Sequence, residues 1–226
     1  EMEDVRLSAL LSLLALRGVE VPELLGLDDE MRAQALPAPL PKQVVDVVGT
    51  GGDRANTANI STMAAVAIAA AGLLVVKHGN RASTSASGSA DVLEALGVNL
   101  DLDIDAISET FDKTGITFLF ANKFHPSMRH AARVRRELGF PTVFNILGPL
   151  TNPAKPEVSV VGVAREGAAP LVAGVFAERG TSAFVFRGED LGLDEVTTVE
   201  PTRLWEVRDG RIEERLIDTA EILDLP

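Results

Sequence analysis

The stretch VVDVVGTGGDRANTANISTMAAVAIAAAGLLVVK, residues 44–77, decides the fold of this chain. It predicts a buried strand over Val44–Val48, a glycine-rich loop, a helix over Ser61–Ala71 and a second strand over Leu73–Lys77. Short apolar strands that alternate with helices are typical of a mostly parallel sheet with helices on both faces. The stretch therefore predicts an α/β fold.

The same alternation continues along the chain. It predicts further helices over Ala90–Leu96, Ile104–Lys113, part of Ser127–Leu138 and Ala168–Glu178, and further strands over Ile116–Phe120, Val158–Val163 and Ala183–Phe186. The end of the chain differs, because Trp205–Val207 and Arg211–Glu213 flank Asp209-Gly210. That dipeptide between two apolar runs is typical of a tight antiparallel hairpin.

The residues before this core predict a small all-α domain. Leucines and a valine recur at helical spacing over Glu3–Leu16, Gly18 ends the run, and a second helix begins at Pro22. The segment LPAPLP, residues 36–41, cannot continue a helix, because prolines lack an N–H donor and push the preceding residue to extended backbone. We therefore expect a helical domain over residues 1–40 and an α/β domain over residues 41–226.

The composition is that of an ordinary globular protein, with 46% hydrophobic and 24% charged residues. The net charge of −12 predicts a surface that repels nucleic acid and anionic membranes, so a bound phosphate must meet a local cluster of donors. The absence of cysteine excludes disulfides, thiolate metal sites and cysteine nucleophiles. No apolar run reaches the roughly 18 residues that span a bilayer and no signal peptide is recognised, so the cytoplasm is the expected compartment.

The first motif with chemical content is the loop Gly49-Thr-Gly-Gly-Asp53, which is followed by Thr57–Thr62 at the start of the predicted helix. Glycines after a parallel strand let backbone N–H groups close on phosphate oxygens, and the positive end of the next helix adds to the attraction. Ligands also gather at the carboxyl ends of such strands. The alternative is a tight turn followed by an N-cap at Asn59 or Ser61.

The second motif repeats this arrangement one unit later. Lys77-His-Gly-Asn-Arg81 follows a strand, and hydroxyl side chains follow at residues 83–89. A lysine, an arginine and several hydroxyls at a strand end suit a polyanion, and Gly79 permits close approach of the backbone. The alternative is a solvated loop in which His78 only ends the strand.

Two further segments carry charge. Arg129, Arg133 and Arg136 lie at helical spacing behind Phe124-His-Pro126, and composition does not choose among the arginines of this segment or exclude a charged outer face. Carboxylates follow the strand at Phe186, in Gly188–Asp190 and in Leu193–Glu195. Oxygen ligands in such a place suit magnesium bound to a phosphorylated substrate, although acidic loops are also common on solvated surfaces.

Taken together and in this order, the motifs GTGGD, NIST, KHGNR, SGSAD, FHP, VRRELG, FNILGPLTNP and GLDE resemble the anthranilate phosphoribosyltransferase family. The resemblance covers about Glu3 to Thr198. It implies transfer of the 5-phosphoribosyl group from 5-phosphoribosyl 1-diphosphate to the amino group of anthranilate, with Mg²⁺ as cofactor. It also implies a small helical domain, a large α/β domain that resembles the pyrimidine nucleoside phosphorylases, and a homodimer through the helical domain, with no nucleic acid or membrane as partner.

The resemblance also implies roles for individual residues. The donor's phosphates, ribose and metal would be held by Gly49, Gly52, Asp53, Thr57, Asn59, Ser61, Thr62, Lys77, Ser85 and Ser89. Ile60, Gly79 and Arg81 would also bind substrate. Anthranilate would face His78, Asn80, His125 and Arg135, with Arg135 on its carboxylate. Magnesium would be bound by Ser61, Asp194 and Glu195. No protein nucleophile is implied, and Lys77, Asn80 and Arg135 would position the substrates.

This sequence departs from the family pattern in a few places. Arg54 stands where the family often has glycine, Thr84 replaces a usual serine, and the family's first helix and its helical region after the hairpin are not recognised in this stretch. Two other functions stay open at this point: a pyrimidine nucleoside phosphorylase-like enzyme and a non-catalytic relative that binds nucleic acid.

Overall fold

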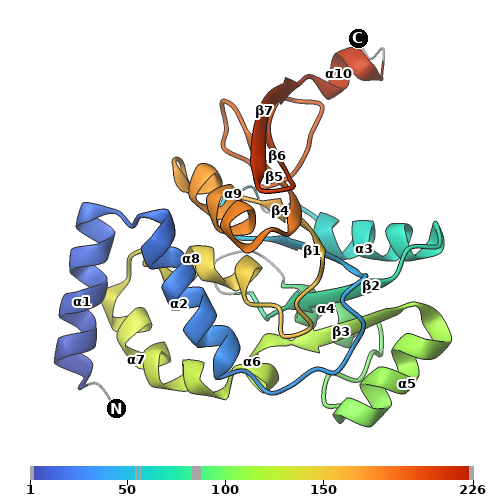
Figure 1. The fold of residues 1–226 in the computed structure, drawn as a ribbon, viewed down its shortest axis with the longest axis horizontal. Helices are drawn as coiled ribbons and strands as arrows, with labels where there is room; N and C mark the ends of the chain where they lie inside the picture. Colours follow the sequence, from blue (N-terminus) through green and yellow to red (C-terminus); the bar gives the residue numbers. More distant parts are fainter. Residues whose placement is uncertain (1–2, 54, 56, 83–87, 224–226) are drawn as a thin grey trace.

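The computed structural model describes residues 3–53, 55, 57–82 and 88–223. Seven strands form one sheet in the order β3-β2-β1-β4-β5-β6-β7 (Figure 1). The strands are β1 (Val45–Gly49), β2 (Val75–Gly79), β3 (Ile116–Phe120), β4 (Val158–Gly162), β5 (Ser182–Gly188), β6 (Thr202–Arg208) and β7 (Arg211–Ile217). The first five are parallel and the last two join them antiparallel. The predicted α/β fold with a mostly parallel sheet is confirmed.

Apolar side chains alternate between the two faces of the sheet, as the sequence pattern requires. On one face, Val47 and Val75 pack with Ala65 of α3 (Ile60–Ala70). On the other face, Val76 packs with Phe111 of α5 (Ile104–Thr114). Helices therefore cover both faces, and the loops at the carboxyl ends of the strands are left to form a site.

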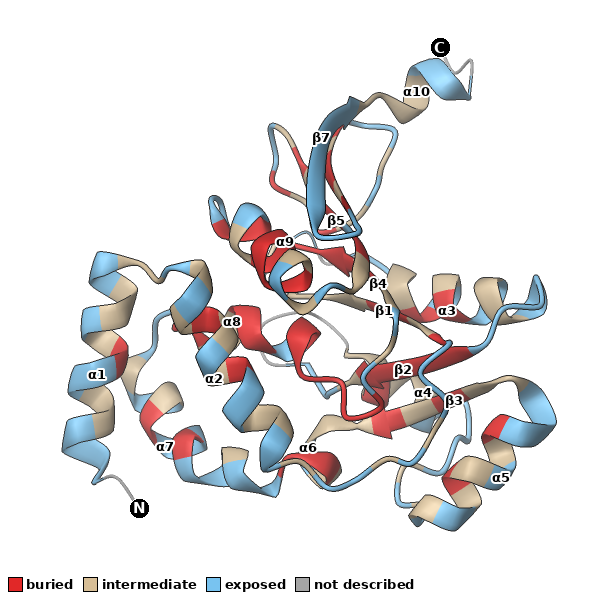
Figure 2. Ribbon diagram, in the orientation of Figure 1, coloured by how far each residue is buried: buried red, intermediate tan, exposed pale blue. Residues whose placement is uncertain are grey.

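The larger core lies where the N-terminal helices meet the sheet. It joins α1 (Asp4–Arg17) and α2 (Val21–Ala33) to α8 (Phe144–Leu147) and α9 (Ala168–Arg179). Helix α2 packs on α9 at Gly174, where a Cβ atom would lie 2.6 Å from Val21. Figure 1 shows α1, α2, α7 and α8 together on one side of the molecule, and Figure 2 shows α8 and α9 largely buried. The division into domains at residue 40 stays a prediction.

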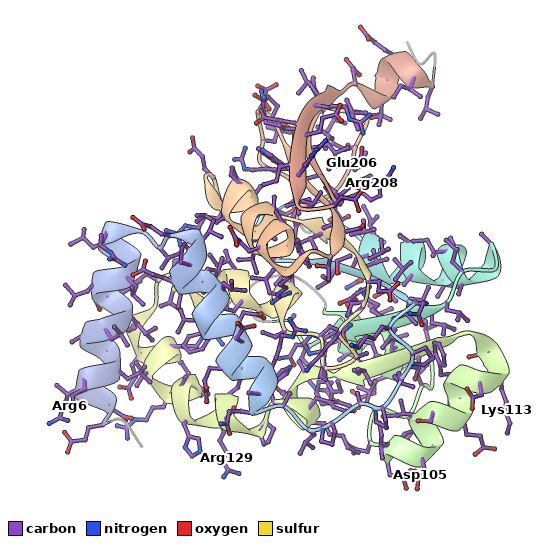
Figure 3. The ribbon with its side chains drawn as sticks, viewed as in Figure 1. Arg6, Asp105, Lys113, Arg129, Glu206 and Arg208 are labelled. Atoms are coloured by element: carbon purple, nitrogen blue, oxygen red, sulfur yellow. The ribbon has the colours of Figure 1, made fainter. Side chains whose placement is uncertain are left out.

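The hairpin at the end of the chain is confirmed. Its turn residues Asp209 and Gly210 have φ values of 50° and 71°, the backbone that an Asp-Gly turn favours. Strand β7 is largely exposed and projects from the body of the molecule (Figure 2). Charged side chains such as Arg6, Asp105 and Lys113 point outward at the periphery (Figure 3).

The remaining helices are shorter or lie near the cavity described below. They are α4 (Ser89–Ala95), α6 (Ala121–Phe124), the 3-10 turns η1 (Pro126–Met128) and η2 (Gly148–Leu150), α7 (Arg129–Leu138) and α10 (Thr219–Ile222). The hydrophobic pattern does not predict α6, α8, η2 or α10, because three or four residues are too few to show a helical period.

Candidate active site

A cavity of about 670 Å³ lies at the carboxyl ends of β1 and β2. The chain runs from β1 outward to β3 on one side and from β4 to β7 on the other, so the direction of winding changes between β1 and β4. Ligands of open α/β sheets bind at this kind of switch point. Both predicted phosphate loops and the predicted acceptor segment contribute to the cavity wall.

The glycine-rich loop after β1 is held open by positive backbone angles and by a carboxylate. Gly51 and Gly52 have φ values of 64° and 91°, which side chains other than glycine rarely adopt. The Gly51 N–H donates to Oδ2 of Asp194 at 2.7 Å. At Gly49 a Cβ atom would lie 2.6 Å from the same oxygen, so the loop that carries Asp194 packs directly on the end of β1.

Helix α3 begins at this cavity. Asn59 caps it, since its Oδ1 accepts from the N–H of Thr62 at 3.1 Å. Ser61 Oγ donates to the same oxygen at 3.4 Å and accepts from Nζ of Lys77 at 3.1 Å. The N-cap alternative and the anion-binding interpretation therefore coexist, because the cap leaves the positive helix end at the cavity wall.

Lys77 lies behind this wall. Its side chain is 2% exposed, and its Nζ also donates to the Val47 carbonyl. Burial lowers the pKa of Lys77 to about 8, and the charges of Asp46 and Glu195 oppose that shift. The ammonium thus lies between the two loop-bearing strands.

The side chains of the second loop line the cavity and also bond to neighbouring elements. Asn80 lines the cavity, and its Nδ2 donates to Asn122 at 3.1 Å. Arg81 also lines the cavity, but its guanidinium binds Glu94 at 2.7 Å and Asp91 at 3.1 Å and lies over the Phe120 ring. Most of the positive charge of Arg81 is therefore already paired.

Two buried histidines form part of the opposite wall. The rings of His78 and His125 meet edge to face with centroids 5.2 Å apart, and Nε2 of His125 lies 2.9 Å from the Thr151 carbonyl. Burial lowers the pKa of His125, and burial together with His125 lowers the pKa of His78 to about 3. Both rings are neutral at pH 7, and His78 at 3% exposure is not part of a solvated loop.

Arg135 on α7 completes that wall. Its guanidinium carbon lies 5.2 Å from the centroid of the Phe144 ring, and the side chain forms no ion pair within the described part of the chain. Burial lowers its pKa, with no carboxylate to oppose the effect. By contrast, Arg133 binds Glu137 at 2.9 Å on the outer face of the same helix. Arg135 thus offers an uncompensated positive charge to the cavity.

Residues 41–223 match the profile of the family described as "Glycosyl transferase family, a/b domain". The chain belongs to this glycosyl transferase family. Curated relatives are named anthranilate phosphoribosyltransferase: the protein of Arthrobacter sp. (strain FB24) is 56% identical over 96% of this chain, and that of Streptomyces griseus is 53% identical over 98%. Each match covers 62% of the relative, so the chain spans about three fifths of their length.

Solved structures agree with this membership of the glycosyl transferase family. Anthranilate phosphoribosyltransferase from Thermus thermophilus has a TM-score of 0.89 and 42% identity, covering 98% of this chain and 66% of that one. The Saccharomyces cerevisiae enzyme in complex with PRPP and Mg has a TM-score of 0.84 and 32% identity, covering 94% and 60%. A further yeast structure holds 4-fluoroanthranilate.

The acidic residues of this glycosyl transferase chain gather beside the glycine loop. Burial raises the pKa of Asp194 to about 6, with the Gly51 N–H opposing and the nearby Asp53 adding to the rise. Burial and the charge of Asp194 raise the pKa of Glu195 to about 7. Carboxylates that repel one another in this way suit a cation between them.

The described residues contain no cluster of three or more His, Asp or Glu side chains arranged to hold a metal ion alone. Magnesium usually binds one or two protein carboxylates together with substrate phosphates, so the pair Asp194 and Glu195 fits that mode. Ser61 lies at the start of α3 with its hydroxyl on Asn59 and Lys77. Its place among the metal ligands stays a prediction.

Most of the predicted site residues of the glycosyl transferase chain line one cavity. They are Gly49, Asp53, Thr57, Asn59, Ser61, His78, Gly79, Asn80, Arg81, Ser89, His125, Arg135, Asp194 and Glu195. Gly52, Ile60, Thr62 and Lys77 are not part of its lining, and their contact with substrate stays a prediction. Ser85 lies outside the described residues, as do the family departures Arg54 and Thr84.

The structure adds residues that the sequence analysis did not single out. Phe144 holds Arg135, and Thr151 holds His125. Asp46 and Asn152 are buried behind the cavity and bonded to each other at 2.9 Å. A carboxylate among four valines, VVDVV, was the available signal for Asp46, since charged residues are rarely buried without a partner. No described helix is long and apolar enough to cross a membrane.

Proposed function

We propose that this chain is the substrate-binding core of an anthranilate phosphoribosyltransferase. The reaction transfers the 5-phosphoribosyl group of 5-phosphoribosyl 1-diphosphate to the amino group of anthranilate and releases diphosphate, in tryptophan biosynthesis. The observation that carries the proposal is one cavity lined both by two loops suited to phosphate and by Arg135, whose guanidinium forms no ion pair with any residue that the structure describes. The relatives that bear this name, and the yeast structure with PRPP and Mg, support it.

The donor would occupy the side of the cavity formed by the glycine loop and the start of α3. Backbone N–H groups at Gly49–Asp53 and the positive end of α3 would stabilise negative charge on the leaving diphosphate. Magnesium, when bound by Asp194 and Glu195, would neutralise further charge on the diphosphate. Lys77 does not line the cavity, but its ammonium donates to Ser61, which does, and would add positive charge to this side of the cavity.

The acceptor would occupy the side of the cavity formed by α7 and the two histidines. Arg135 would pair with its carboxylate, and the neutral rings of His78 and His125 would give an apolar wall against its ring. The aromatic amine is neutral at pH 7, so its lone pair can attack the anomeric carbon as the bond to the diphosphate oxygen breaks. The proton lost from the amine then passes to solvent, and the protein supplies position rather than a nucleophile.

The test is the loss of anthranilate fluorescence when the chain, 5-phosphoribosyl 1-diphosphate and magnesium are mixed. We expect the fluorescence to decrease only when all three are present. The rate of this decrease should be much lower for the Asp194→Asn, Glu195→Gln double variant. No turnover with a folded protein that binds both substrates would contradict the proposal for this stretch. Phosphorolysis of a pyrimidine nucleoside in the same preparation would favour the phosphorylase-like alternative.

We also propose a homodimer through the helical domain and a cytoplasmic location. Apolar side chains on α1 are exposed, with Leu13 at 64% and Leu16 at 87%. Leu13 and Leu16 lie three residues apart on the helix, and a contiguous exposed apolar patch is a feature of protein–protein interaction sites. Light scattering should report a dimer for the parent chain and a monomer for the Leu13→Glu, Leu16→Glu variant, and a monomeric parent chain would contradict this part of the proposal.

A further inference from the structure

The two strands that carry the phosphate loops separate toward the cavity. Strand β1 is in register with β4 over five residue pairs, and β2 with β3 over five, but β1 and β2 share the single pair Val45↔Val75. Beyond that pair, the Val47 carbonyl, the Val76 carbonyl and the His78 N–H are bonded to side chains. A parallel ladder would normally satisfy these groups, so the opening is a built feature of the sheet.

Three side chains fill the opening. The carboxylate of Asp46 accepts from the His78 N–H at 3.1 Å, and the ammonium of Lys77 donates to the Val47 carbonyl. Asn152 donates to the Val76 carbonyl at 2.9 Å and to Oδ2 of Asp46 at 2.9 Å. Side chains thus replace the missing backbone hydrogen bonds between β1 and β2. Lys77 and Asp46 each bond to the backbone of the opposite strand, and Asn152 bonds to the backbone of β2.

Asp46 is the centre of this network. Its side chain is fully buried, and it does not line the cavity. Burying a carboxylate is costly unless it is paired and hydrogen-bonded, and here the partners are the backbone N–H groups of His78 and Val47, the Asn152 amide and the nearby charge of Lys77. In some proteins a buried charge of this kind specifies one arrangement of the elements that it joins.

Asn152 extends the network to the acceptor side. It belongs to the segment GPLTN, residues 148–152, of which Gly148, Pro149 and Thr151 line the cavity. The Thr151 carbonyl bonds to the ring of His125, and Asn152 Oδ1 accepts from the Ala154 N–H at 2.9 Å. Through Asp46, strand β1 is thus joined both to β2 and to the segment that holds His125.

We propose that Asp46, with Asn152, is a positioning residue that fixes the glycine loop relative to residues 78–81 and 148–151, and so the donor relative to the acceptor. The inference rests on the proposed function, because it assigns the two sides of the cavity to two substrates. Transfer between two bound substrates requires reacting atoms about 3 to 3.5 Å apart, and a displacement of about 1 Å can cost a hundredfold in rate. A residue that sets this separation acts on turnover more than on either binding step.

The test compares Asp46→Asn with a matched control, Asp28→Asn. Asp28 is also a fully buried carboxylate, paired with Arg179 between α2 and α9, and it belongs to neither loop. For Asp46→Asn we expect dissociation constants for donor and for anthranilate within about threefold of the parent, whereas kcat falls by about tenfold to a hundredfold. For Asp28→Asn we expect a lower melting temperature and a kcat near that of the parent.

Two further measurements keep the inference testable if Asp46→Asn folds poorly. The double variant Asp46→Asn, Asn152→Asp swaps the two side chains and so keeps one carboxylate and one amide in the pair. Its kcat should be higher than that of either single variant. Hydrogen exchange at the amides of residues 49–53 and 78–81 should rise in Asn152→Ala and stay unchanged in Asp28→Asn. Amide hydrogen exchange does not depend on turnover, so an inactive parent chain would count against the proposed function alone.

An unchanged kcat in Asp46→Asn would overturn the inference. So would loss of binding of one substrate without change in the other, which would make Asp46 a contact of that substrate. Equal effects of Asp46→Asn and Asp28→Asn on kcat and on hydrogen exchange would show that Asp46 contributes stability and no positioning.

Discussion

Replacing Arg135 with alanine should weaken the binding of anthranilate far more than the binding of the donor. The side chain is half-buried, and its guanidinium carbon lies 5.2 Å from the centroid of the Phe144 ring. Burial lowers the pKa of Arg135, and no carboxylate among the described residues opposes this effect. A hydrogen bond to a charged group contributes about 1.5 to 3 kcal/mol, which corresponds to about tenfold to 150-fold in the dissociation constant. The partial burial of Arg135 places the expected effect in the upper half of this range.

The matched control is Arg133→Ala, two residues earlier on the same helix. Arg133 is 68% exposed and pairs with Glu137 at 2.9 Å on the surface, where solvent screens ion pairs and they contribute little to stability. Its loss should leave both dissociation constants within about threefold of the parent.

The assay is titration of anthranilate fluorescence, with calorimetry for the donor and a thermal melt for folding. Arg135→Lys keeps the charge but loses the planar fork, and it should fall between the parent and Arg135→Ala. Strong sensitivity at Arg133 with a neutral Arg135→Ala would refute the assignment of the acceptor side of the cavity. Equal weakening of donor and anthranilate would refute the separation of the two sides.

Three further outcomes are expected. The donor with magnesium should raise the melting temperature far more than ribose 5-phosphate does. A ligand at a hundredfold excess over its dissociation constant stabilises the native state by about 2.7 kcal/mol. Equal shifts in melting temperature from the two ligands would exclude a diphosphate site. The Asp194→Asn, Glu195→Gln variant should lose about a hundredfold or more in turnover with partial rescue by excess magnesium and nearly unchanged anthranilate binding, whereas parent-like magnesium dependence would make the pair a solvated loop. The pKa of Glu195 is raised from 4.5 to about 7 in the native state. The free energy of unfolding without ligand should therefore fall by about 1 to 2 kcal/mol as the pH rises between those values. For the same reason, magnesium should bind more weakly at pH 6 than at pH 8. Denaturant titrations of the parent chain and Glu195→Gln check the first effect, since the fall should be smaller in the variant, where only the raised pKa of Asp194 and other buried carboxylates remains. Calorimetry with magnesium checks the second effect.

The local sequence determined much of the fold. Strand Ile116–Phe120 and the hairpin around Asp209-Gly210 were predicted as the structure has them, because apolar spacing and turn residues act within a few positions. The two phosphate loops and the acidic segment were also recognisable, since each follows a predicted strand and parallel strands end at one edge of a sheet. These features depend on neighbours in the chain, so the chain order alone reveals them.

The sequence carried only partial information about charged residues. It indicated that Arg81 and Arg135 belong to segments near a site. It did not show that Arg81 is paired with Glu94, whereas Arg135 forms no ion pair within residues 3–53, 55, 57–82 and 88–223. Whether a charge is available to a ligand depends on which carboxylates come within reach after folding. The partners of Arg81 come from α4, which lies beside the second loop only in the folded chain, so local spacing does not reveal the pairing.

Only the tertiary structure decided how the two halves of the cavity are joined. Asp46 bonds to Asn152 across 106 positions of sequence, and Gly51 bonds to Asp194 across 143. The opening between β1 and β2 is absent from the hydrophobic pattern, because Val44–Val48 and Leu73–Lys77 each read as ordinary buried strands. Pairing of strands and burial of Lys77 and Asp46 are set by long-range contacts, whose free energy belongs to the assembled sheet and not to any segment of it.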